Sequence, residues 1–217
     1  MACKADRRLF FALCVAAALW FYMFSPWTGS ISNFWLNMCI SAVVLSSMAI
    51  PWSGVMPRYG AWLHKPKLKD ACLQLLIGVA LAFALWGIFW IGDKLSQFMF
   101  SFARGQVDNV YAMKDGSALP LIAVLLLFLI GPAEEFFWRG YVQKTMSERI
   151  GANAAFIVTA IVYALVHIWS FNFMLVMAAL VAGGIWGLIY RLKPSLLPAL
   201  VVSHALWDTL VFVILPI

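Results

Sequence analysis

Two adjacent carboxylates and a guanidinium directly follow a long run of apolar residues. Glu134, Glu135 and Arg139 come after the apolar segment 118–130. An ionised side chain near the centre of a bilayer costs roughly 2.5–3.5 kcal/mol, so this cluster needs compensating interactions. On a helix, Glu135 and Arg139 lie on one face and are predicted to pair, whereas Glu134 points about 100° away. Glu134 therefore needs partners from other helices.

The other candidate catalytic residues are two histidines and an aspartate within later apolar segments. His167 lies in the segment 153–170, and His204 and Asp208 lie in the segment 196–215. His204 and Asp208 are four residues apart, so a helix places them on one face. A single histidine in a membrane helix is more typical of hydrogen bonding between helices, and the catalytic interpretation requires that these groups meet.

The spacing along the chain predicts that these side chains lie at one level. With a turn expected at residues 149–152, Glu134 lies sixteen residues before position 150 and His167 seventeen residues after it. In an antiparallel helical hairpin these positions come level, provided that the fourth helix continues beyond the membrane edge. His204 follows Pro194 by ten residues, which is a comparable depth. We expect the three groups to meet nearer the cytoplasmic side.

The chemistry that suits these groups is hydrolysis of a peptide bond. This reaction needs a water, a base that activates it, and donors to the developing oxyanion. We expect Glu134 to be the base and His167 to hold the water from the other side. His204 would face the scissile carbonyl, with Asp208 orienting it or sharing its proton. The neighbouring Glu–Arg pair would fix the helix that carries the base.

A metal site uses the same atoms. Glu134, His167 and His204 would make a set of two histidines and one carboxylate for zinc or another divalent ion, with a position open for water. The HExxH pattern, in which two histidines of one helix share the ion, is absent from the sequence. Both mechanisms stay open, with metal-free catalysis favoured.

The composition is that of an all-α, polytopic membrane protein. The chain has 217 residues, of which 65% are hydrophobic and 11% charged, too few charges to cover a soluble core. Seven apolar segments are near the length of about 20 residues that a bilayer requires. They are residues 8–25, 31–51, 71–92, 118–142, 153–170, 172–190 and 196–215.

The ends of these segments predict the orientation. With a cytoplasmic N-terminus, twelve of the fifteen basic residues lie inside, and the other three, Lys94, Arg104 and Lys114, lie outside. The basic residues at the ends of apolar runs fit a lipid bilayer, and no nucleic-acid partner is expected. The first segment is expected to stay as an uncleaved span of an integral, multi-pass protein of a prokaryotic inner membrane. The third histidine, His64, lies in a basic inner loop.

Cysteines, tryptophans and glycines suggest structural roles. The four cysteines show no CxxC pattern and are expected to be reduced, without a disulfide framework. The eleven tryptophans are expected to be mostly interface anchors and lipid-facing bulk. Gly131-Pro132 predicts a kink before the two acids. Gly183, Gly184 and Gly187 form a small-residue face for close helix packing.

Three motifs in separate spans resemble those of the CAAX-protease and bacteriocin-processing family, which includes the type II CAAX prenyl endopeptidases. The motifs are Glu134-Glu135 with Arg139, Tyr163 with His167, and His204 with Asp208. The resemblance covers residues 118–212 and implies an intramembrane endopeptidase whose first glutamate is the catalytic base. Tyr163 stands where the family usually has phenylalanine, and Asp208 where asparagine is common.

The sequence therefore predicts one membrane domain, residues 1–217. Residues 1–70 contribute two spans and a basic cytoplasmic loop, and residues 118–212 form the catalytic core. The predicted function is cleavage of a membrane-tethered peptide or protein tail near the cytoplasmic leaflet. The alternatives are a non-catalytic immunity or scaffold protein with the same fold, and a small proton-coupled transporter. Paired repeats with broken helices, which are typical of transporters, are not visible in the sequence.

Overall fold

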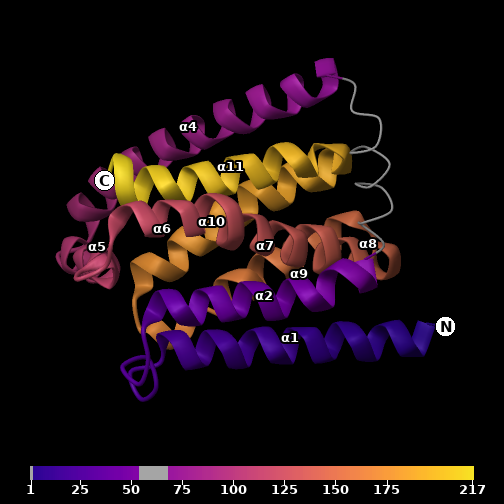
Figure 1. Ribbon diagram of the computed structural model, residues 1–217, viewed down its shortest axis with the longest axis horizontal. Helices are drawn as coiled ribbons and strands as arrows, with labels where there is room; N and C mark the ends of the chain where they lie inside the picture. The colour runs from indigo at the N-terminus through magenta and orange to yellow at the C-terminus, as the bar shows by residue number, and fades with distance from the viewer. Residues whose placement is uncertain (1, 54–67) are drawn as a thin grey trace.

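The computed structural model describes residues 2–53 and 68–217, and in these residues it is a bundle of helices without strands (Figure 1). Seven of the described helices are long and apolar enough to cross a membrane, which confirms the predicted all-α, seven-span fold. The spans are Asp6–Phe24, Phe34–Ser53, Leu68–Met99, Leu119–Ile150, Ala152–Ser170, Phe173–Leu192 and Pro194–Ile214. His64 lies outside the described residues.

The named helices follow the chain in a simple up-and-down order. They are α1 (Ala2–Phe24), α2 (Phe34–Ser53), α4 (Leu68–Met99), α5 (Ala103–Tyr111), α6 (Leu119–Leu125), α7 (Gly131–Glu135), α8 (Lys144–Ile150), α9 (Ala152–Leu165), α10 (Phe173–Leu192) and α11 (Leu197–Thr209). The fourth span runs through α6, α7 and α8 and continues to Ile150, as the depth argument requires.

The two ends of the bundle carry different connections. The end that holds the start of α1, here the amino-terminal end, also holds the α8–α9 and α10–α11 turns (Figure 1). The opposite end, here the carboxy-terminal end, holds α5, the α1–α2 and α9–α10 turns and the C-terminus. The two termini therefore lie at opposite ends, as an odd number of spans requires.

The third span is longer than the sequence suggested. Its predicted end at residue 92 is wrong, because α4 continues through Asp93 and Lys94 to Met99. The side chain of Asp93 is buried rather than solvated. Its carboxylate accepts a hydrogen bond from Gln97, one turn later, and lies 3.3 Å from the ammonium group of Lys94. These local partners allow the helix to pass through two charges. The segment that follows contains the short helix α5.

The fourth span contains two π-helical stretches around its acidic residues. Leu126–Ile130 precedes α7 and Phe136–Gln143 follows it. Pro132 has no amide hydrogen to donate, so the backbone just before it cannot keep a regular α-helical ladder. The predicted irregularity at Gly131-Pro132 thus takes the form of widened turns within a continuous helix. Such turns are common at functional sites.

Three glycines show how closely the helices approach. A Cβ at Gly131 would lie 2.6 Å from Ala205 Cα, so a side chain there would push α7 away from α11. A Cβ at Gly183 would lie 2.5 Å from the ring of Tyr163. Gly187 contacts the Gln143 side chain, whereas a Cβ at Gly184 would meet nothing within 4 Å. The predicted small-residue face is therefore correct for two of its three glycines.

Candidate active site

The first motif forms the expected ion pair. Arg139 Nη1 donates to Glu135 Oε1 at 2.8 Å, and both side chains are almost completely buried. Arg139 Nη2 donates to the carbonyl of Gly183 at 3.0 Å. The guanidinium also lies over the rings of Tyr163 and Trp186. Arg139 therefore joins the fourth span to the fifth and sixth, as well as neutralising its neighbour.

Glu134 finds a partner on the fifth span. The hydroxyl of Tyr163 donates to Glu134 Oε2 at 2.8 Å. The family pattern usually has phenylalanine at position 163, so this bond comes from the residue that departs from the pattern. Because a hydroxyl donates only one hydrogen, Glu134 Oε1 receives no hydrogen bond from Tyr163.

His204 lies between two carboxylates. Its Nδ1 is 2.8 Å from Glu135 Oε1, and its Nε2 is 3.5 Å from Asp208 Oδ2. The ring stacks on Trp186, with the ring centres 3.9 Å apart. The contact with Asp208 follows the predicted helix face. The contact with Glu135 was not predicted, because helical spacing within one span says nothing about partners on another.

His167 is held in one tautomer. Its Nδ1 lies 2.8 Å from the carbonyl oxygen of Tyr163, which only accepts, so Nδ1 carries the proton. Its Nε2 is then an acceptor, and Trp20 Nε1 donates to it at 3.1 Å. Trp20 lies on α1 and is 1% exposed. The sequence analysis missed this residue.

The tryptophans as a group are more buried than expected. The side chains of Trp20, Trp35, Trp138, Trp186 and Trp207 are all less than a tenth exposed. The expectation that most tryptophans face lipid or the interface is wrong for these five. Two of them touch the candidate histidines, Trp20 by a hydrogen bond and Trp186 by stacking. A tryptophan in an apolar helix gives no sequence signal that separates these roles.

The predicted residues share one cavity of about 630 Å³. Glu134, Tyr163, His167, His204 and Asp208 all line it. The rest of the lining is mainly apolar and comes largely from α4, α5, α10 and the last residues of the chain. Glu135 and Arg139 do not line this cavity and act from behind His204 and Glu134. These five polar residues, here called the polar floor, thus line the same cavity as the apolar side chains that form its walls.

The residues present do not fit a metal ion. An imidazole binds a metal through an unprotonated nitrogen. The only such nitrogen of His167 accepts the Trp20 N–H, and both nitrogens of His204 face carboxylates. Within residues 2–53 and 68–217, no group of three His, Cys, Asp or Glu side chains has metal-binding geometry. The ring nitrogens of His167 and His204 are thus all turned toward protein partners.

Comparison with known proteins gives one match. Residues 116–210 match the family model described as Rce1-like: Type II CAAX prenyl endopeptidase Rce1-like. The matched segment holds the fourth to seventh spans and all three motifs. It does not include α1, α2, α4 or α5, and therefore not Trp20. No curated protein and no solved structure matches the chain.

Proposed function

We propose that the protein is an intramembrane endopeptidase in which Glu134 activates the attacking water, on the basis of the match of residues 116–210 to the Rce1-like family of type II CAAX prenyl endopeptidases. Its substrate is a membrane-tethered peptide or protein tail. The observation that carries the proposal is the single apolar cavity lined by Glu134, His204 and Asp208 from two spans. We expect the whole chain to act as one membrane domain.

Glu134 is the base in this mechanism. Tyr163 occupies Oε2, so Oε1 accepts a proton from the water while the water oxygen attacks the scissile carbonyl carbon. The resulting tetrahedral intermediate carries negative charge on the former carbonyl oxygen. Glu134 then gives its proton to the leaving nitrogen, and the C–N bond breaks. The products are a carboxylic acid and an amine, the acid gives its remaining proton to the amine, and Glu134 is regenerated as a carboxylate.

His204 is the donor to the oxyanion. With protons on both nitrogens, it donates Nδ1–H to Glu135 and offers Nε2–H to the substrate oxygen. The 3.5 Å separation between Nε2 and Asp208 is longer than a normal hydrogen bond, so this N–H is available to a substrate. Asp208 faces the same nitrogen and holds the ring in place when no substrate is bound. A carboxylate at position 208 serves this purpose, although it cannot itself donate.

His167 is a positioning residue in this proposal. The sequence predicts that His167 holds the attacking water. In the structure, however, its one accepting nitrogen, Nε2, already accepts the hydrogen bond from Trp20. Its other nitrogen donates to the carbonyl of Tyr163, the residue whose hydroxyl holds Glu134. His167 therefore acts on the base through Tyr163, within the wall of the cavity.

The test uses purified wild type and the isosteric variant Glu134→Gln with a panel of tethered peptides. Loss of the base is expected to lower kcat by about 10²–10⁴-fold, the usual contribution of general base catalysis. Glu148→Gln removes an exposed acid of the same span and is the matched control, with wild-type rates expected. Wild-type cleavage by Glu134→Gln would refute the assignment of the base.

A chelator arm separates the two mechanisms left open by the sequence. Metal-free catalysis predicts the same rate with and without a chelator that binds divalent ions. Loss of activity that zinc restores would show that a metal is needed. A wild-type protein that cleaves no peptide of the panel but retains a stable protein partner would favour the scaffold alternative.

A further inference from the structure

The candidate cavity occupies only one half of the bundle. On the fourth span its lining consists of Leu126 and Glu134, with no residue beyond Glu134. On the seventh span the lining begins at His204 and continues to the C-terminus. Phe24 at the end of α1 and Phe34 at the start of α2 also contribute. The cavity thus extends from the polar floor toward the carboxy-terminal end.

The cavity also reaches the side of the bundle between two spans. Its lining includes Leu95 and Met99 of α4 and Phe173 of α10, and each of these side chains is about half exposed. Residues that line a cavity and are also exposed mark the place where it meets the surroundings. A tethered peptide therefore has an apolar route from the bilayer into the site, between α4 and α10.

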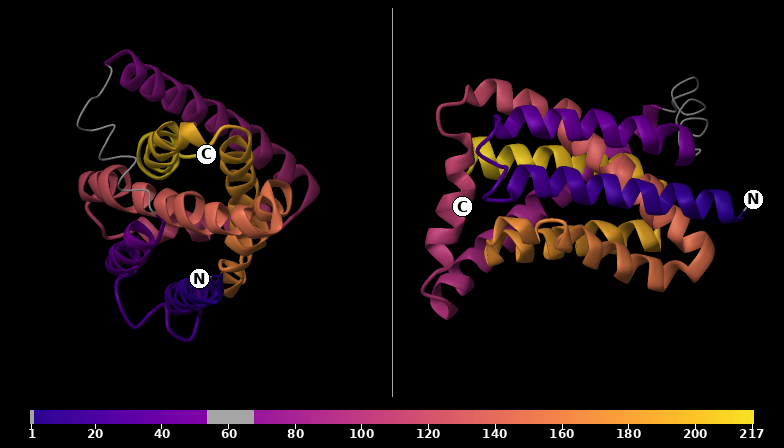
Figure 2. Two further views of the ribbon diagram at one scale, coloured as in Figure 1. Left: turned by 90° about the vertical axis from the view of Figure 1, so that its right-hand side faces the viewer. Right: turned by 90° about the horizontal axis from the view of Figure 1, so that it is seen from below.

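Helix α5 crosses this end of the bundle above the cavity. Figure 2 shows α5 running across the axes of the spans at the end that holds the C-terminus. Val107, Val110 and Tyr111 belong to the lining. Gln106 binds the start of α10, because its carbonyl accepts from Asn172 and its side chain accepts from the Met174 amide. This helix limits the cavity on its carboxy-terminal side.

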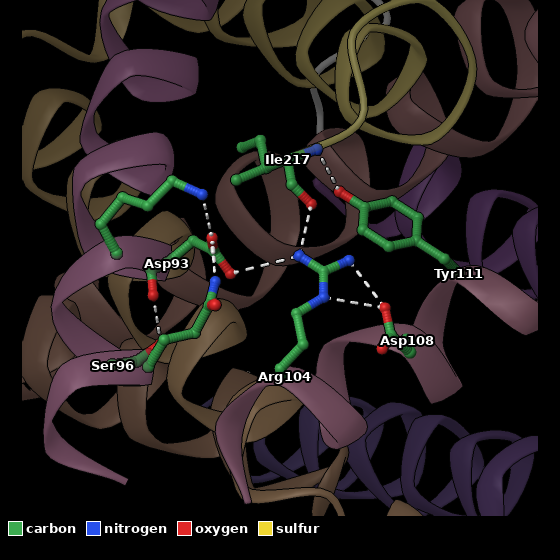
Figure 3. A network of polar contacts seen from close by, with 8 residues as sticks. Asp93, Ser96, Arg104, Asp108, Tyr111 and Ile217 are labelled. Atoms are coloured by element: carbon green, nitrogen blue, oxygen red, sulfur yellow. Dashed lines mark hydrogen bonds and ion pairs between the residues drawn. The ribbon is translucent and has the colours of Figure 1, made fainter. Parts of the chain in front are cut away.

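A polar network fixes α5 in this position (Figure 3). Arg104 donates twice to Asp108 and lies 3.9 Å from Asp93 of α4. The hydrogen bonds to Asp108 raise the pKa of the Arg104 guanidinium above its ordinary value. The Ile217 amide donates to the Tyr111 hydroxyl, which joins the chain end to α5. Of the three basic residues at this end, Lys94 and Arg104 thus lie against acids, and Lys114 donates to the carbonyl of Phe212.

The excess of basic over acidic residues lies at the amino-terminal end of the bundle. The described basic residues at the amino-terminal end are Arg7, Arg8, Lys69, Lys144, Arg149, Arg191 and Lys193, against the acids Asp6, Asp70 and Glu148. At the carboxy-terminal end, Lys94, Arg104 and Lys114 are matched by Asp93, Asp108 and Asp115. The sequence that joins α2 to α4 adds Arg58, Lys65 and Lys67 and no acid. Because loops rich in Lys and Arg stay cytoplasmic, the amino-terminal end is cytoplasmic.

We infer that the cavity opens on the non-cytoplasmic side of the membrane, and that its substrate is the exported flank of an apolar membrane anchor. The inference rests on the proposed function and replaces the sequence-based expectation of cleavage near the cytoplasmic leaflet. That expectation and a cytoplasmic N-terminus are incompatible with a cavity confined to the carboxy-terminal half. The anchor would lie in the outer half of the bilayer, with the scissile bond reaching Glu134 between α4 and α10.

The test is the side from which the cavity can be labelled. Ser96 lines the cavity, and Ser96→Cys is nearly isosteric. It is placed in a chain whose four native cysteines are replaced by serine, and labelled with a membrane-impermeant thiol reagent in right-side-out and inverted vesicles. Asp115→Cys and Ser195→Cys report the carboxy-terminal and amino-terminal ends. Retained thermal unfolding of each variant in detergent confirms that it is folded.

We expect Ser96→Cys and Asp115→Cys to react in right-side-out vesicles, and Ser195→Cys only in inverted ones. Reaction of Ser96→Cys only in inverted vesicles, or from neither side, would overturn the inference. The same labelling in the Glu134→Gln background needs no catalysis, so its failure is distinct from failure of the proposed function. Any anchored substrate found to be cleaved by wild type is then mapped by mass. A cut at the cytoplasmic flank would also contradict the inference.

Discussion

Glu135 connects the two spans that carry the proposed base and the proposed oxyanion donor. One of its oxygens, Oε1, accepts from both Arg139 and His204. Its other oxygen, Oε2, is buried and has no hydrogen-bond partner among the described residues. Adjacent glutamates on one helix thus have different positions: Glu134 faces the cavity, and Glu135 holds an imidazole from another span. The expectation that Glu135 serves only Arg139 was too narrow.

Tyr163→Phe tests the hydroxyl that holds the base. The change removes one hydrogen bond to a charged group, worth about 1.5–3 kcal/mol, so kcat is expected to fall by about 10–100-fold. The ring stays in place against Gly183, so the unfolding temperature should change little. Tyr22→Phe removes a hydroxyl far from the site and is the control. Unchanged kcat in Tyr163→Phe would mean that this bond does not matter for catalysis.

Trp20→Phe tests the positioning of His167 by the first span. Phenylalanine keeps an aromatic ring in the core but removes the N–H that fixes His167 Nε2. We expect kcat to fall while KM stays similar, and the pH dependence of kcat to change because His167 Nε2 is free to take a proton. Trp27→Phe, at a largely exposed position, should leave both unchanged. If Trp20→Phe lowers the stability of the fold but leaves the pH dependence of kcat unchanged, Trp20 only packs in the core and does not position His167.

At the scale of helices, the approach of α7 to α11 brings the base to its partners. Gly131 is in direct contact with the backbone of Ala205, one residue from His204. The preceding π-helical turn leads directly into α7, which carries Glu134 at the cavity and Glu135 behind it. The contact thus links the Gly-Pro irregularity to the geometry of the site.

Gly131→Ala should therefore damage both fold and activity. The added Cβ overlaps α11, and overpacking of this kind typically costs 1–3 kcal/mol. Gly184→Ala is the matched control on α10, because its Cβ would meet nothing and alanine is a better helix former by about 0.5–1 kcal/mol. Thermal unfolding in detergent and kcat on one peptide measure both effects. Equal stability of the two variants would contradict the close α7–α11 packing.

Helix positions could be predicted from the sequence, but most contacts between helices could not. Apolar length predicts spans, and four-residue spacing predicts the Glu135–Arg139 and His204–Asp208 contacts. Neither signal tells which face of α1 meets α9, so the bond between Trp20 and His167 was missed. The sequence did not predict that α4 continues past residue 92, because the contacts of Asp93 with Lys94 and Gln97 are seen only in the structure.

At the scale of the whole molecule, the site depends on more than the segment that matches the family. Residues 116–210 contain Glu134, the proposed base, together with His167, His204 and Asp208. The first span supplies Trp20, and α4 and α5 supply much of the apolar wall. A core of buried side chains also joins the first two spans to the fourth and fifth. The N-terminal spans and the segment 93–117 thus both contribute to the walls of the cavity.

The position of the cavity shows what composition alone could not predict. Charge counting along the sequence predicts which end of each span is cytoplasmic. Spacing predicts that the polar groups come level, but it does not tell toward which end the helices separate. In the structure the cavity lies toward α5 and the C-terminus, and the charge pattern predicts that this end is outside the cytoplasm.

The central claim is that a carboxylate of the fourth span and an imidazole of the seventh act in one reaction. The most direct measurement is kcat for Glu134→Gln, His204→Gln and the double variant on one peptide. Residues that act as a unit lose their effect together, so the double variant should be about as slow as the slower single variant. If the two losses multiply instead, the groups act independently, and the account of a shared site is contradicted.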